Sequence, residues 1–407
     1  ILIFIKHEIS YDRFHDKKDN LYRVIFKMTN PEGRVISPQM TAPPGPAMME
    51  EFPEVKAATR ITGYRDGYFS FNNKAYKSDN VIYADSLFLE MFTFHLLLGD
   101  PGTVLTKPFS LVLNEETARN IFGDENPIGK VLRWNNKDDL VVTGVVTSPP
   151  GNSHLQFTSL ISFSSLFEDK RLYMDWNGGM QYYHYLELLP GSSQEITEAK
   201  LPDFMDKHFN YMFEGSGYSV HASLQPVQDI HLKSGYVGEI EMTGSMSVIY
   251  IYSAIALFIL FIACINFMNL TTAKSTRRAR EVGMRKVLGA DRENLIGQFL
   301  GESVIMSLVA LVIALILVEI LLPEFNQMVS RELDLYQVRN LDLIIGIPVF
   351  VIIVGILAGS YPAFIMSAFK PLNVLRGILS GERSSAGFRN VLVLFQFAIS
   401  LVLIICT

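Results

Sequence analysis

The sequence predicts a membrane protein in which an α-helical transmembrane bundle is joined to a two-lobed α+β domain outside the cytoplasm. The 407-residue chain is 49% hydrophobic and has a mean hydropathy of +0.23, which is high for a soluble protein. Long apolar runs follow residue 246, whereas residues 1–245 are mixed and polar. Segments typical of strands and of helices interleave in that polar block, which favours an α+β fold.

Charge divides the chain in the same way. Residues 1–245 carry 22 Lys and Arg against 31 Asp and Glu, a net charge of −9, and the remainder carries 13 against 10, or +3. An acidic polar block followed by a mildly basic apolar block is typical of membrane proteins. No basic face points to nucleic acid. The two cysteines, Cys264 and Cys406, lie in apolar runs, so the polar block has no disulfide or thiolate site.

A membrane-spanning helix needs about 20 apolar residues. The runs that satisfy this length are residues 246–270, 295–322 and 341–361. Residues 1–20 are expected to be the end of a first transmembrane helix and a helical stalk. Residues 377–407 are expected to be a linker and the start of a further transmembrane helix.

Basic residues predict the orientation of these helices. They concentrate in the connections 271–294 and 362–390, whereas residues 323–340 carry more acidic than basic side chains. The positive-inside rule places the first two connections in the cytoplasm. By parity, residues 21–245 then lie outside.

The polar block contains segments typical of strands and helices. Strands are expected at residues 21–29, 68–71, 110–113, 131–133, 140–146 and 182–188. Helices are expected at residues 43–55, 86–91, 115–122 and 194–209.

No segment commits the chain to catalysis. Residues 123–130 (GDENPIGK) resemble a phosphate-binding loop, but five residues separate Gly123 from Gly129 where four are needed, and Val131 replaces the Ser or Thr that holds Mg²⁺. The histidines show no metal-ligand spacing, and no nucleophile motif is present. We therefore expect no catalytic residue, cofactor site or metal site.

The cytoplasmic segment 274–289 combines three features. Glu281 lies four residues from Arg277 and from Arg285, which allows ion pairs along one helix face. Met284, Val287 and Leu288 recur at helical spacing and form a small apolar patch, and Gly289 is suited to ending the helix. This design favours a docking element. The alternative is a basic flank that contacts lipid head groups.

Gly355 and Gly359 form a small-xxx-small pattern in the last complete apolar run. Such a pattern permits close packing of neighbouring membrane helices. Membrane helices are also rich in glycine for other reasons, and both interpretations stay open.

These motifs resemble those of the FtsX-like/MacB family of ABC transporter permeases. The resemblance is carried after the first complete span by residues 265–269 (INFMN) and 280–290 (REVGMRKVLGA), and after the last by 359–363 (GSYPA) and 371–376 (PLNVLR). In the polar block it is carried by residues 85–94, 99–101, 122–123, 126–130 and 144–146.

The resemblance implies a domain plan. Residues 21–245 correspond to a MacB-like periplasmic core domain, with a porter-like lobe at 21–61 and 157–232 and an inserted sabre-like lobe at 62–156. Residues 246–376 correspond to an FtsX-like permease domain with a cytoplasmic coupling helix at about 274–289. The implied ATPase-coupling residues are Arg277, Arg280, Glu281, Gly283, Met284, Arg285, Lys286, Val287, Leu288 and Gly289.

The resemblance also implies a function. Such a chain is a non-catalytic permease of the bacterial inner membrane, and a separate cytoplasmic ABC ATPase uses ATP and Mg²⁺. ATP hydrolysis would move the periplasmic domain and drive export or extraction of a peptide, drug or lipoprotein. A periplasmic adaptor, an outer-membrane channel and a second permease half, as in duplicated long-form permeases, are further expected partners.

The sequence leaves one alternative function open and disfavours another. One is an FtsX-type regulator of periplasmic partners that transports nothing, and the sequence does not separate it from a transporter. The other is a secondary transporter, which needs polar or broken helices at the bilayer midplane. The runs at 246–270 and 304–318 lack these features.

Overall fold

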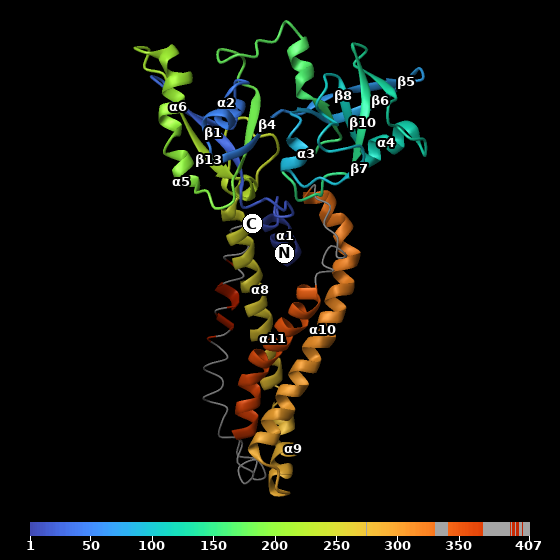
Figure 1. The fold of residues 1–407 in the computed structure, drawn as a ribbon. Coiled ribbons are helices and arrows are strands. Elements are labelled where there is room, and N and C mark those ends of the chain that lie inside the picture. Colours follow the sequence, from blue (N-terminus) through green and yellow to red (C-terminus); the bar gives the residue numbers. More distant parts are fainter. Residues whose placement is uncertain are drawn as a thin grey trace. The chain divides into compact units, whose positions relative to one another are not determined.

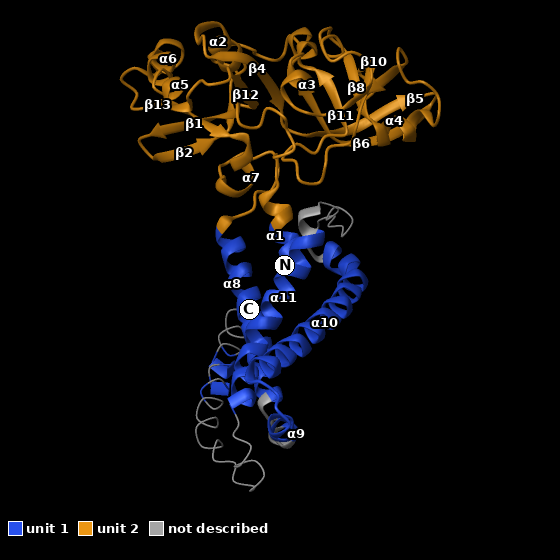
Figure 2. Cartoon of the chain, turned by 60° about the horizontal axis from the view of Figure 1, so that its bottom comes forward, with its two compact units in different colours: residues 1–5, 247–407 blue, residues 6–246 orange. Residues whose placement is uncertain are grey.

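The computed structural model describes residues 1–273, 275–329 and 341–368, together with seven residues between 391 and 401. The chain forms two compact units, which are coloured separately in Figure 2. One unit comprises residues 6–246. The other comprises residues 1–5 and 247–407.

The unit of residues 6–246 is built on a sheet of 13 strands, labelled in Figure 1. One part of this sheet contains β1 (Leu21–Asn30), β2 (Gly33–Ser37), β3 (Gln39–Met40), β4 (Val55–Thr62), β12 (Tyr182–Leu188) and β13 (Ser219–Pro226). The other part contains β5 (Arg65–Phe71), β6 (Lys74–Ala84), β7 (Leu96–Leu98), β8 (Ser110–Asn114), β9 (Val131–Trp134), β10 (Asp138–Val146) and β11 (Ser159–Ser162). A single residue pair, Ile61 with Ala84, joins β4 to β6.

Short helices flank these strands. They are α2 (Pro44–Glu51), α3 (Phe88–Met91), α4 (Glu115–Phe122), α5 (Gln194–Glu198), α6 (Leu201–His208) and α7 (Ile230–Lys233), with 3-10 turns η1 (Phe163–Glu168), η2 (Asn210–Phe213) and η3 (Val227–Asp229). Local signals explain their ends: the Asn114 side chain accepts a hydrogen bond from Thr117 N at 2.8 Å and so caps α4. The single helix expected over residues 194–209 is two helices, because Pro202 stands in the first turn of α6.

All six expected strands are present, with ends that differ by at most three residues. The division into two lobes stays a prediction: residues 6–246 form one compact unit, in which the two parts of the sheet meet at the pair Ile61 with Ala84. Strand β11 departs from the expected boundary at residue 157. It pairs with β6 and β8, not with strands of the expected porter-like lobe.

The helical stalk expected over residues 6–20 is wrong beyond its first turn. Helix α1 (Leu2–Ile9) ends before Ser10, and Asp12 has a left-handed φ of 56°. Asp12 is completely buried, and its carboxylate accepts a hydrogen bond from His154 N at 3.1 Å. The buried polar contact therefore turns the chain where a helix would carry Asp12 away from its partner.

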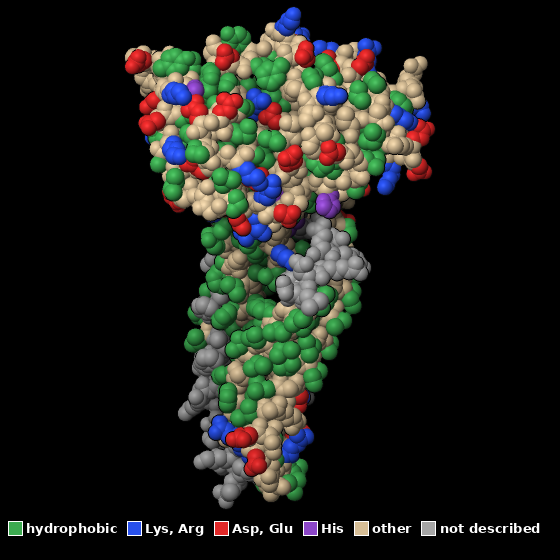
Figure 3. All heavy atoms as spheres, viewed as in Figure 1, with side chains coloured by type: hydrophobic (Ala, Val, Ile, Leu, Met, Phe, Trp, Pro, Cys, Tyr) green, Lys and Arg blue, Asp and Glu red, His purple; other side chains and the backbone are tan. Residues whose placement is uncertain are grey.

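The second unit contains long apolar helices. They are α8 (Met246–Ala273), α10 (Arg292–Val329) and α11 (Leu341–Ala368), with the shorter α9 (Ser275–Val287) between the first two. All three long helices are long and apolar enough to span a membrane, as expected. In Figure 3 their visible face is largely hydrophobic, and charged side chains gather around α9.

Candidate functional site

Helix α9 is the element that the sequence singles out for docking. A glycine caps its C-terminal end: Gly289 has a left-handed φ of 96°, and Ala290 N donates to Arg285 O at 2.9 Å. These contacts satisfy carbonyl groups at the last turn. The side chains of Arg277 and Arg280 lie outside the described residues.

One face of α9 is buried against the two helices that follow it. Val282 is only 2% exposed and belongs to a cluster with Leu295 and Phe299 of α10 and Ala363 and Met366 of α11. Gly283 beside it is also buried. Burial of a valine side chain contributes about 1.5–3 kcal/mol, so this cluster fixes α9 on α10 and α11.

Polar contacts reinforce this attachment. Arg285 pairs with Glu281 at 2.7 Å and donates to Gln298 Oε1 of α10 at 2.6 Å. Lys286 Nζ donates to Ser367 O of α11 at 2.6 Å. Two of the basic side chains expected on a lipid-facing flank are therefore engaged within the protein.

Arg278 makes a third connection. Its Nη1 lies 2.6 Å from Glu302 Oε2 of α10. The sequence places Glu302 beside the apolar core of a span, and the structure gives this carboxylate a cationic partner. No local signal in the sequence indicates this contact, because the two residues are 24 positions apart.

The opposite face of α9 is apolar and exposed. Met284, Val287 and Leu288, hereafter the apolar patch, are 60%, 65% and 82% exposed. These residues lie outside the three candidate spans. Exposed apolar clusters outside a membrane are typical of protein interaction sites.

Helix α11 packs closely on α10 at the two glycines of the small-xxx-small pattern. A Cβ on Gly355 would lie 3.1 Å from Val304 Cα, and one on Gly359 would lie 2.6 Å from Ser303 Cβ. Larger residues would therefore push the helices apart. The pair α10 and α11 forms a tightly packed support for α9.

The segment that resembles a phosphate loop has a structural role. Residues 123–130 connect α4 to β9, and Lys130 pairs with Glu125 inside the loop. The described residues contain no group of three or more His, Cys, Asp or Glu side chains arranged to hold a metal ion.

Two buried polar contacts in the other unit have no signal in the sequence. Arg23 on β1 is fully buried, with its Nη1 and Nη2 at 2.6 and 2.8 Å from the two oxygens of Glu239. Nearby in the chain, His231 Nε2 lies 2.7 Å from Glu8 Oε2. These pairs attach the entry segment (residues 6–20) and the exit segment (residues 231–245) to the domain. The partners are 216 and 223 positions apart, so no local pattern predicts them.

Two sequence families match the chain. Residues 1–204 match the MacB-like periplasmic core domain, and residues 253–371 match the FtsX-like permease C-terminal domain. The chain belongs to the MacB/FtsX-like family of ABC transporter permeases. The resemblance drawn from the sequence motifs is thereby confirmed. The described residues include three helices long and apolar enough to span a membrane, and this permease is a membrane protein with a periplasmic domain.

Relatives differ in how much of their length this permease spans. The macrolide export ATP-binding/permease protein MacB of Bdellovibrio bacteriovorus is 26% identical over 65% of this chain, which spans 38% of MacB. The ABC transporter permease YknZ of Bacillus subtilis is 23% identical over 83% of this chain and 75% of its own length.

Two solved structures are similar to about half of the chain. A domain of a permease protein from Porphyromonas gingivalis shares 27% identity at a TM-score of 0.47, covering 52% of this chain and 91% of that domain. The periplasmic region of MacB from Actinobacillus actinomycetemcomitans shares 18% identity at a TM-score of 0.37, covering 53% of this chain and 94% of that region.

Proposed function

We propose that this permease transmits the work of a separate cytoplasmic ATPase to its periplasmic domain, without catalysis of its own. The ATPase would dock on the apolar patch of α9, and ATP and Mg²⁺ would be bound by that partner. The observation that carries this proposal is the two-sided character of α9. Val282 is buried against the membrane helices while Met284, Val287 and Leu288 are exposed.

The exposed face of α9 is better suited to a protein partner than to a lipid surface. Lys286 is engaged with Ser367 and Arg278 with Glu302, so these side chains are committed to contacts within the permease. The apolar patch offers the kind of small, dense contact in which a few buried side chains dominate binding energy. The remaining charges would set the register of docking more than its strength.

The attachment of α9 supports transmission. Because Val282, Arg285 and Lys286 each contact α10 or α11, a force on α9 reaches those helices directly. The close approach of α11 to α10 at Gly355 and Gly359 makes the pair stiff. Closely packed elements of this kind move as units rather than deforming continuously.

The entry and exit segments are also firmly attached to the periplasmic domain. Arg23 and Glu239 join the exit segment to β1, and Glu8 and His231 join the entry segment to the exit segment. Displacement of either segment would therefore move the sheet as a body. We infer that the domain's motion drives export or extraction of a peptide, drug or lipoprotein, with an adaptor, an outer-membrane channel and a second permease half as further partners.

Co-purification tests the docking step. Met284→Asp should release the partner ATPase, because a carboxylate in a buried contact cannot be solvated. Met242→Asp is the matched control, since Met242 is 79% exposed in the other unit and should retain the ATPase. Retention of the ATPase by Met284→Asp would contradict the proposal. Loss of the ATPase from Arg278→Gln but not from Met284→Asp would instead favour a basic flank that acts through its charge.

A further inference from the structure

Six strands of the periplasmic domain close into a ring. Strand β11 pairs with β8, and the pairing continues through β10, β9 and β5 to β6, which pairs again with β11. Such a ring is a small β-barrel with no free edge inside it. Its interior is filled by a cluster that includes Phe69, Val81, Leu111, Leu132 and Val142.

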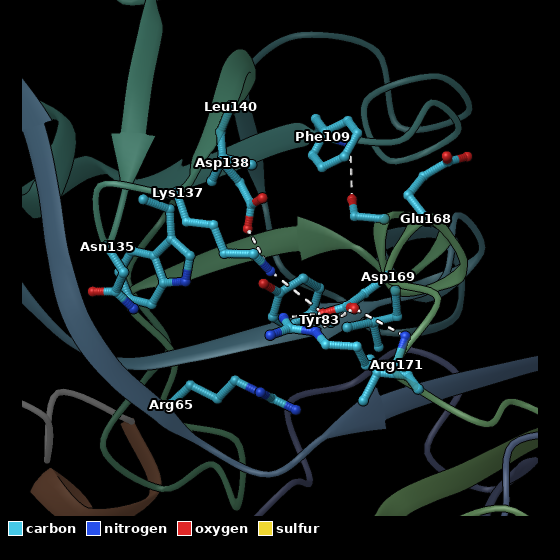
Figure 4. Close-up of a pocket in the computed structure, with 14 residues that line it drawn as sticks. Arg65, Tyr83, Phe109, Asn135, Lys137, Asp138, Leu140, Glu168, Asp169 and Arg171 are labelled. Atoms are coloured by element: carbon cyan, nitrogen blue, oxygen red, sulfur yellow. Dashed lines mark hydrogen bonds and ion pairs between the residues drawn. The ribbon is translucent and has the colours of Figure 1, made fainter.

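The barrel has a hollow mouth. Registers such as Asp138 with Trp134 and Ile161 with Leu111 bring one end of each strand to the same rim. A cavity of about 740 Å³ opens there, and Figure 4 shows the residues that line it. Barrel mouths are a common location for ligand sites, and this volume lies within the usual range for them.

Charged side chains from two segments line the cavity. Lys137 comes from the β9–β10 turn and Asp138 from the first position of β10, and the segment after β11 supplies Asp169 and Arg171. Lys137 Nζ lies 3.4 Å from Asp169 and 3.8 Å from Asp138, and Arg171 pairs with Asp169 at 2.7 Å. Ion pairs that stay in contact with solvent contribute little to stability. A charged ligand can therefore replace one partner of these ion pairs.

The floor of the cavity is aromatic and partly strained. Tyr83 and Trp134 line it, together with Leu140. Phe109 has a left-handed φ of 60°, and its N–H donates to Ser165 Oγ at 2.8 Å. A bulky residue in this conformation is strained, and such strain is concentrated at functional sites.

Arg65 supplies an exposed cation at the rim. It extends from the start of β5 at the rim, apart from the paired charges in Figure 4. Among the described residues, Arg65 takes part in no ion pair with the carboxylates that line the cavity, and its guanidinium stands 5.4 Å from the Tyr83 ring centroid. An arginine beside an aromatic surface is suited to a ligand that combines a carboxylate with an apolar group.

We propose that the barrel mouth binds a carboxylate attached to an aromatic or aliphatic group, with Arg65 pairing to the carboxylate and the Tyr83–Trp134–Phe109 floor receiving the apolar group. Two sources share this chemistry: the C-terminal residue of a polypeptide, and a small organic acid. The site and α9 belong to different units, so failure of this proposal would leave the proposed ATPase docking untouched.

Titration calorimetry on the full chain in lipid nanodiscs tests the site. The probes are N-acetyl-phenylalanine, which has a free carboxylate, and N-acetyl-phenylalaninamide, which does not. The acid should bind roughly tenfold more tightly than the amide, and Arg65→Gln should abolish that preference. Equal affinity for the two probes, or an unchanged preference in Arg65→Gln, would overturn the proposal.

Two further variants make the test specific. Asp169→Asn frees Lys137 and Arg171 from their shared carboxylate and should tighten binding of the acid several-fold, whereas a purely structural role would weaken it. Arg133→Gln is the control, because Arg133 is an exposed arginine paired with Asp139 and does not line the cavity. Loss of binding in this control equal to that in Arg65→Gln would also overturn the proposal.

A third probe, N-acetyl-Ala-Ala-Phe, distinguishes the two sources of the ligand. Tighter binding of this peptide than of N-acetyl-phenylalanine assigns the site to polypeptide C-termini. Equal or weaker binding assigns it to small organic acids. Either result keeps the proposed chemistry.

Discussion

The two units of this permease place charge and apolar surface in opposite ways. The periplasmic unit buries Arg23 completely with Glu239 and packs many of its aromatic side chains into buried clusters. The three long helices bury only 11%, 0% and 17% of their most apolar windows and carry exposed charge around α9. The difference shows which solvent each unit meets, because apolar faces are stable only in lipid and buried charges only in pairs.

Thiol labelling should show the largest difference between the two units, because each introduced cysteine is either labelled from outside or not labelled at all. In a background without Cys264 and Cys406, Lys77→Cys should react with a membrane-impermeant reagent added to intact cells with a permeable outer membrane. Leu288→Cys should react only after the inner membrane is opened. Both positions are exposed, with the Lys77 side chain at 76% and Leu288 at 82%. Labelling of Leu288→Cys from outside would reverse the orientation.

Breaking the buried pair of the periplasmic unit should have the largest effect on stability. Arg23→Met leaves Glu239 buried without its partner and should lower the free energy of unfolding by about 3–5 kcal/mol. Urea denaturation followed by tryptophan fluorescence measures this. Arg133→Gln, which breaks an exposed pair, should cost about 0–1 kcal/mol. Similar losses in the two variants would refute the contrast.

In the helical unit, stability should depend more on close helix packing than on charge pairs. Gly359→Val should destabilise the helices by about 1–3 kcal/mol, because its side chain would collide with Ser303. Gly346→Val in the same helix meets no atom within 4 Å and should be nearly neutral. Thermal unfolding in detergent, followed by circular dichroism, compares the two. An equal effect would mean that α10 and α11 do not pack at Gly359.

Acid should weaken only the periplasmic unit. Burial lowers the pKa of His184 to about 3, with Arg60 adding to the effect, and its neutral ring accepts from Gly45 N at 3.0 Å and contacts Thr41 O at 2.8 Å. Between the unfolded pKa of about 6.5 and the folded pKa, the unfolded chain binds more protons. Stability should therefore fall as pH drops below 6.5, by up to about 1.4 kcal/mol per pH unit.

The measurement is urea denaturation of the periplasmic unit at pH 7.5 and pH 5. His184→Gln, whose amide does not titrate, should show a smaller loss between these values than the parent. Burial also lowers the pKa of His15 to about 4, so part of the slope should remain. An unchanged slope in His184→Gln would show that this histidine is not held neutral.

Much of the fold follows from local pattern, and the exceptions have physical causes. The long apolar runs and the strand at Tyr182–Leu188 were predictable because nothing in the sequence competes with them. Strand β4 (VKAATRIT) and strand β6 (KAYKSDNVIYA) escaped prediction because alanine and polar residues dilute their β signal. Their pairing partners, not their own residues, make them strands.

The candidate site divides in the same way. The helix over Ser275–Val287 and its apolar patch are local features, so spacing alone indicates them. The contacts of Arg278 with Glu302 and of Lys286 with Ser367 join separate helices and leave no trace in spacing. The barrel likewise depends on the parallel pairing of β6 with β11, which only the folded chain brings together.

The central claim is that docking at α9 moves the periplasmic unit. Spin labels at Lys77→Cys and Ile305→Cys, one in each unit, report the distance between the units by pulsed electron resonance. With the ATPase present, ATP should shift this distance distribution in the parent chain and in Met242→Asp. The shift should be absent in Met284→Asp. A full ATP-dependent shift in Met284→Asp, or none in the parent, would contradict the account.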